Sequence, residues 1–209
     1  MNEKLEQTTS VWMQSGEIAV DTALTVDTTT DVCIIGAGIA GLTTAYLLLK
    51  EGKSVVILDD GPVGGGQTER TTAHLSNAID DRYTEIESWH GQDGAKPAAE
   101  SHRAAIDTIE AIVAREGIDC DFERLDGFLF SPAETGPELL ENELHAVRRA
   151  GLADVELVQS SPIPSFDTGV CLRFPRQGQF HPRKYLAGLT KAIRGMGRED
   201  FYADTCGKS

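Results

Sequence analysis

The feature that most constrains this chain is the glycine string Gly36-Ala37-Gly38-Ile39-Ala40-Gly41, which stands between two apolar stretches. Residues 31–35 are a short apolar run of the kind that forms a strand buried on both faces, so we expect Cys33 to be buried. Residues 39–51 carry apolar side chains at helical spacing, and residues 54–58 are a second apolar, β-branched run. Strand, helix and strand in this order predict a βαβ unit with parallel strands.

The glycine spacing predicts a dinucleotide-binding turn. Gly36 permits a tight turn, Gly38 lets the backbone approach a diphosphate, and Gly41 lets the helix pack close to the strand. The helix N-terminus offers amides and a positive potential to phosphate. Asp59 ends the second strand, 18 residues after Gly41, and suits a ribose hydroxyl better than a 2′-phosphate. Alone, such a string also fits a turn in another α/β fold. The candidate ligands here are Gly36, Ala37, Gly38, Ile39, Ala40, Gly41, Asp59 and Asp60.

A second glycine-rich segment, residues 61–74, reads G-P-V-G-G-G-Q-T-E-R-T-T-A-H. Together with the fingerprint and the acidic strand end, it resembles the D-amino-acid oxidase-like FAD oxidoreductases, which include glycine and sarcosine oxidases. In that family a G-G-x-S/T-x-R-x-x-A stretch runs beside the diphosphate and reaches the flavin ring. The resemblance implies FAD as cofactor. By position it adds to the cofactor-binding residues Gly66, Gln67, Thr68, Arg70, Thr71, Thr72, Ala73 and His74.

Two other interpretations compete with an FAD site. The segment could be a glycine loop under no ligand constraint, and an NAD-dependent dehydrogenase would share the first fingerprint, although the second segment argues against it. Some relatives attach FAD covalently through a histidine near this segment, but that histidine does not align cleanly with His74. We therefore expect His74 to contact the flavin region without a covalent bond.

More narrowly, residues 71–76 (T-T-A-H-L-S), 119–128 and 172–182 resemble the branch of this family that carries a C-terminal Rieske iron–sulfur domain. The resemblance implies oxidation of a small amine, amino acid or related substrate by hydride transfer to flavin, with oxygen or an iron–sulfur domain or partner as electron acceptor. A Rieske cluster needs two Cys-x-His ligand pairs, and this sequence has none. The family's later flavin-domain strands are also missing. We therefore expect an N-terminal fragment, with a non-catalytic dinucleotide-binding fragment as the alternative.

The expected fold class is α/β: a Rossmann-like FAD-binding domain with a parallel sheet, plus a partial α+β substrate domain. The predicted division is an N-terminal arm at 1–30, the FAD-binding βαβ unit at 31–80, and a partial substrate or cap domain at 81–209. In the last part we expect helices at 81–90, 96–116, 137–150 and 183–193. We also expect strands at 121–130, broken at Asp126-Gly127, and a loop-rich region around Pro162, Pro164 and Pro175. Residues Ala105, Ile109, Ile112 and Val113 are expected to form an apolar helix face.

Composition and charge argue against several classes of binding site and location. The formal charge of −14 argues against a nucleic-acid groove or an anionic membrane surface. The four cysteines form no C-x-x-C pair, so no zinc or dithiol motif is predicted. The first ten residues are polar and no apolar run is long enough to span a membrane, which predicts a cytoplasmic protein.

No catalytic acid or base can be assigned from the sequence. Arg173, Arg176 and Arg183 near His181 could bind a substrate carboxylate, but salt bridges within the protein are their commoner role.

Overall fold

The structure, a computed structural model, describes residues 9–15, 18, 24–131, 138–197 and 199–203. Expectations for the rest of the arm, for Pro137 and for the tail after Ala203 lie outside the described residues. The chain forms two compact units: unit 1 comprises residues 1–73, 112–121 and 180–209, and unit 2 comprises 74–111 and 122–179. The chain thus enters unit 2 after Ala73 and returns to unit 1 twice. Which unit serves cofactor and which serves substrate stays a prediction.

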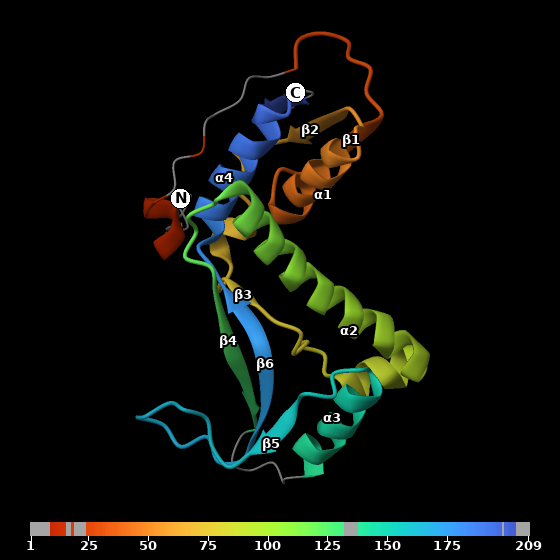
Figure 1. The fold of residues 1–209 in the computed structure, drawn as a ribbon, viewed down its shortest axis with the longest axis vertical. Coiled ribbons are helices and arrows are strands. Elements are labelled where there is room, and N and C mark those ends of the chain that lie inside the picture. The colour runs from red at the N-terminus through yellow and green to blue at the C-terminus, as the bar shows by residue number, and fades with distance from the viewer. Residues whose placement is uncertain (1–8, 16–17, 19–23, 132–137, 198, 204–209) are drawn as a thin grey trace, which may run out of the picture. The chain divides into compact units, whose positions relative to one another are not determined.

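Unit 1 contains the predicted βαβ element. Strand β1 (Val32–Ile35), helix α1 (Ile39–Lys50) and strand β2 (Val55–Asp59) follow one another, and β1 pairs with β2 in parallel. Strand β7 (Glu199–Ala203) pairs in parallel with the other edge of β2, which gives the order β1-β2-β7. Helix α4 (Pro182–Gly195) packs beside α1 (Figure 1). The α/β class and the parallel sheet are confirmed.

Burial within unit 1 differs from the expectation at β1. Helix α1 buries Leu42, Ala45, Tyr46 and Leu49, as its periodicity predicts. Burial along β1 alternates, however, and Cys33 and Ile35 are exposed, Ile35 by 78%. The expectation that Cys33 is buried is therefore wrong for this structure, because the described parts of unit 1 cover only one face of β1.

Unit 2 is built on an antiparallel sheet around β6 (Cys171–Gln179). Strands β3 (His74–Leu75), β4 (Glu123–Phe130) and β5 (Glu156–Val158) all pair with β6, and the long β4–β6 pair is visible in Figure 1. Helix α2 (Tyr83–Glu116) begins in this unit, and α3 (Glu138–Arg149) follows β4. The core joins α2, α3 and β6 through residues that include Tyr83, Ala99, Val147, Leu172 and Phe174.

Several details of unit 2 differ from the sequence expectations. Strand β6 occupies part of the region expected to be loop-rich, and Pro175 is accommodated in a bulge where the β4 register skips from Leu125 to Gly127. Because the bulge absorbs the irregularity, β4 is one strand and is not broken at Asp126-Gly127. On α2, Ile106 is buried whereas Ala105 is exposed. Gly91, with φ 71° and ψ 172°, interrupts α2, so the two helices expected at 81–90 and 96–116 are both present, and residues 92–95 are already part of the second one.

Candidate dinucleotide-binding site

The glycine turn after β1 has the geometry that its sequence requires. Gly36 has a φ of 103°, in the region that favours glycine, and its amide donates to the Leu58 carbonyl at 2.7 Å. A Cβ on Gly41 would lie 1.9 Å from the Gly36 carbonyl oxygen. Helix α1 can therefore approach the turn this closely only with glycine at position 41.

Asp59, at the end of β2, connects the turn to the next loop. One carboxylate oxygen accepts a hydrogen bond from the Ala37 amide at 2.6 Å, and the other accepts one from the Gly61 amide at 2.9 Å. Asp60 is exposed beside it. A carboxylate oxygen can accept more than one hydrogen bond, so both oxygens keep capacity for ribose hydroxyls.

The second glycine-rich segment folds onto the first. The Gly64 amide donates to the Ala37 carbonyl at 3.0 Å, and Thr68 Oγ1 accepts from the Ile39 amide at 3.2 Å, at the start of α1. Arg70 donates to the carbonyls of Gly65 and Gly66 at 3.0 and 2.8 Å. These bonds hold the loop over the N-terminus of α1.

A cavity of about 460 Å³ lies between the turn and this loop. A Cβ on Gly38 would meet only the Thr68 hydroxyl, at 3.2 Å, and a Cβ on Gly66 would meet nothing within 4 Å. The two glycines therefore border open space beside the helix N-terminus, where amides without intrahelical partners favour an anion. The predicted residues that line this cavity are Gly36, Gly38, Ile39, Ala40, Gly41, Asp59, Asp60, Gly66, Gln67 and Thr68.

The other predicted residues lie outside the lining. Ala37 is buried and acts through its amide and carbonyl, and Arg70 braces the loop. Thr71 and Thr72 are exposed after the short 3-10 helix η2 (Thr68–Arg70). Ala73 is buried with a φ of 64°, which is uncommon for a residue with a Cβ. His74 is exposed in β3 and belongs to unit 2.

Five lining residues were not among the sequence candidates: Ile35, Gly61, Pro62, Gly64 and Gly65. Gly64 has a φ of 76°, and a Cβ on Gly65 would lie 2.8 Å from the Pro62 side chain. The run of glycines after β2 was the signal for four of them. Ile35 carries no such signal, because its exposure depends on which face of β1 is covered.

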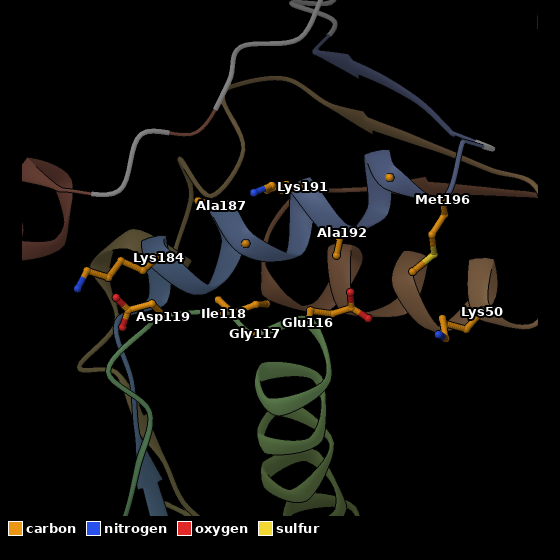
Figure 2. Close-up of a pocket in the computed structure, with 12 residues that line it drawn as sticks. Lys50, Glu116, Gly117, Ile118, Asp119, Lys184, Ala187, Lys191, Ala192 and Met196 are labelled. Atoms are coloured by element: carbon orange, nitrogen blue, oxygen red, sulfur yellow. The ribbon is translucent and has the colours of Figure 1, made fainter.

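A larger pocket, of about 770 Å³, lies elsewhere in unit 1, between α4 and residues 116–119. Figure 2 shows its charged side chains spread along the groove, with Lys184, Lys191 and Lys50 at successive points along its length. Lys184 is already paired with Asp121 at 2.7 Å. None of the predicted cofactor residues lines this groove, and its charges do not converge on one point.

Two of the three arginine candidates for a substrate carboxylate form ion pairs within the protein. Arg173 contacts Asp126 and Glu156, and Arg183 contacts Glu69 at 2.9 Å. Arg176 is exposed at the β6 bulge, where its carbonyl accepts from Arg124 at 2.6 Å. Among the described residues, no cluster of His, Cys, Asp and Glu is arranged to hold a metal ion.

Comparison with known proteins decides the family. A family profile described as FAD dependent oxidoreductase matches residues 31–205, which include the glycine turn, Asp59 and the second glycine-rich segment. The chain belongs to this family. FAD is the family's cofactor, so the reading as an NAD-dependent dehydrogenase is not supported.

Individual relatives agree with the family. YhfW of Bacillus subtilis (strain 168), named as a candidate Rieske 2Fe-2S iron-sulfur protein, is 35% identical over 89% of this chain and 36% of its own length. Gamma-glutamylputrescine oxidoreductase of Escherichia coli (strain K12) is 29% identical over 81% of this chain and 40% of its own. The fold matches L-amino acid deaminase from Proteus myxofaciens with a TM-score of 0.68 and 16% identity, over 93% of this chain and 42% of that one.

The chain thus spans about two fifths of the relatives it matches. The match to YhfW agrees with the resemblance to the Rieske-bearing branch. In the part of the chain that the structure describes, no helix is long and apolar enough to cross a membrane.

Proposed function

We propose that unit 1 binds the adenosine diphosphate half of FAD in the cavity between the 36–41 turn and residues 59–68. We propose further that the chain serves flavin-dependent oxidation of a small amine, amino acid or related substrate. The observation that carries the first proposal is the open space beside Gly38 and Gly66 at the N-terminus of α1.

The residues of this cavity fit the parts of the cofactor. The start of α1 and the backbone of Gly38 and Gly66 suit the diphosphate, because no Cβ intervenes and the helix end favours negative charge. The carboxylates of Asp59 and Asp60 suit the ribose hydroxyls and would repel a 2′-phosphate. When bound, FAD supplies a hydride acceptor.

Residues 70–74 are proposed to continue toward the flavin. The family resemblance supports this direction. Arg70 also stabilises the loop by donating hydrogen bonds to the carbonyls of Gly65 and Gly66. His74 is proposed to contact the flavin region without a covalent bond, and flavin that stays attached to acid-precipitated protein would exclude this role.

The substrate class rests on the relatives. One of them acts on gamma-glutamylputrescine, an amine, and a protein of the same fold acts on L-amino acids, according to their names. The electron acceptor is proposed to be oxygen or an iron–sulfur domain or partner, which the similarity to YhfW supports. A cytoplasmic location stays a prediction.

The reaction class is tested by loading the 209-residue protein with FAD and adding substrates without oxygen. Loss of the oxidised flavin absorption with an amine or amino acid, and its return on admission of air, is expected. Retained FAD that none of a panel of amines and amino acids reduces would favour the non-catalytic fragment instead.

A further inference from the structure

Residues Ser10–Ser15, here called the N-terminal clip, contact the segment that follows the cavity lining. The clip contains the 3-10 helix η1 (Val11–Gln14). Trp12 donates from Nε1 to the Thr71 carbonyl at 2.9 Å, and the Ser10 hydroxyl donates to the Glu69 carbonyl. The clip therefore fixes two backbone carbonyls directly downstream of Gln67 and Thr68.

The same clip contacts the start of α4. The Ser15 hydroxyl lies 2.7 Å from His181 Nε2, and the Ser15 carbonyl accepts from Arg183 Nε at 3.1 Å. The Trp12 ring meets the His181 ring edge-on, with centroids 5.0 Å apart. Trp12 is thus held between the 68–71 segment and the first residues of a helix.

A third contact joins segment 68–71 directly to α4. Arg183 donates to the Glu69 carboxylate at 2.9 Å, and Glu69 is only 9% exposed. Residues from two distant parts of the sequence, the clip and the start of α4, therefore converge on segment 68–71. All of them belong to unit 1.

We propose that Trp12 and Ser15 are positioning residues for FAD binding: they hold segment 68–71 against α4 and so order the loop that lines the cavity. The inference rests on the proposed function of the cavity. Its physical reason is that a loop with three consecutive glycines, Gly64–Gly66, has high conformational entropy, which cofactor binding must otherwise overcome.

The test compares Trp12→Phe and Ser15→Ala with Trp89→Phe as a matched control. Trp12→Phe keeps an aromatic ring but removes the Nε1–H donor, and Ser15→Ala removes the hydroxyl near His181. Trp89 is 61% exposed in unit 2, so its replacement leaves the clip unchanged. Two quantities are measured: the FAD dissociation constant, and amide hydrogen exchange at Glu69 and Arg70 in cofactor-free protein.

Each clip variant is expected to weaken FAD binding on the order of three- to tenfold, the size expected for one lost hydrogen bond. It should speed exchange at Glu69 and Arg70 while exchange within α1 stays at the control's rate. Unchanged exchange at Glu69 and Arg70 would overturn the inference, and so would faster exchange throughout unit 1, which indicates a general structural role.

The two proposals can fail separately. Wild-type protein that binds no FAD would refute the proposed function, whatever the clip does. FAD binding that is equally tight in wild type and both clip variants would refute the positioning role alone.

Discussion

The carboxylate of Asp59 accepts a 2.6 Å hydrogen bond from the backbone amide of Ala37, which lies 22 residues earlier in the chain. The acid at the end of β2 therefore shapes the glycine turn as well as facing the cavity. Its other oxygen accepts from Gly61, so the same side chain fixes the start of the second glycine-rich segment. One carboxylate thus connects both loops of the proposed site.

Asp59→Asn is expected to impair the site more than Asp60→Asn. Asparagine has one acceptor oxygen in place of two, so one of the amides of Ala37 and Gly61 loses its partner at a cost of about 1–3 kcal/mol. Asp60 is exposed and serves as the control. Urea unfolding and FAD titration measure the two effects, and equal losses of stability in both variants would contradict the role given to Asp59.

Gly41→Ala and Gly66→Ala are expected to separate folding from cofactor binding. The Cβ at position 41 would collide with the Gly36 carbonyl, so the turn must shift at a cost of about 1–3 kcal/mol. A Cβ at position 66 would have no protein atom within 4 Å, so the free energy of unfolding should change by less than about 0.5 kcal/mol. Gly66→Ala should nevertheless weaken FAD binding, and unaltered affinity would place the diphosphate elsewhere.

Acidification is expected to weaken the N-cap of α4, where the His181 side chain accepts a hydrogen bond. The Lys184 amide donates to Nδ1 of His181 at 3.3 Å, so the neutral ring carries its proton on Nε2, facing Ser15. Burial lowers the pKa of His181 below its ordinary value of 6.5; the positive charges of Lys184 and Arg183 lower it further, and Asp121 opposes them.

The sign of the pH effect follows from that direction. A histidine with a lowered folded-state pKa binds fewer protons when folded, so its contribution to stability is complete above about pH 6.5 and is lost as the pH falls. The melting temperature should therefore decline from about pH 7.5 to about pH 5.5. His181→Asn, which keeps a helix-capping side chain, should reduce that decline, and His90→Asn, at an exposed position of α2, should not. If the melting temperature of both variants falls equally with pH, His181 is not the cause of the decline.

Unit 2 contains a buried acid, Glu143, that contacts the start of α2. Glu143 in α3 is 2% exposed and accepts from the amides of Tyr83 and Thr84 at 2.8 and 3.1 Å, at the start of α2. Glu143→Ala should cost about 2–4 kcal/mol, because two helix-terminal amides lose their partner. Glu141→Ala, exposed on the same helix, should cost less than about 0.5 kcal/mol in urea unfolding. A comparable loss in the two variants would refute this capping role.

The sequence predicted the local parts of this fold because their causes are local. Gly36 and Gly41 mark a turn whose backbone needs glycine, and the periodicity of α1 identifies Leu42 and Leu49 as buried. Family resemblance extended the prediction to the second glycine-rich segment, most of which lines the cavity up to Thr68.

What the sequence could not predict depends on contacts between distant residues. The exposure of Cys33 follows from which face of β1 is covered, and strand β6 tolerates Pro175 because a bulge removes the need for its amide. The contacts of Trp12 join residues about 60 and 170 positions apart, as its hydrogen bond to Thr71 and its ring contact with His181 show. No periodicity or motif encodes such a pairing.

The most direct test of the central claim is competition at the cavity between FAD, FMN and ADP. The cavity is assigned to the adenosine diphosphate half, so FAD should bind, ADP should displace it, and FMN, which lacks the adenosine and one of the two phosphates, should bind far more weakly. Equal binding of FAD and FMN, or FAD binding that excess ADP cannot reduce, would contradict the assignment of the 36–41 turn and Asp59 to this half of the cofactor.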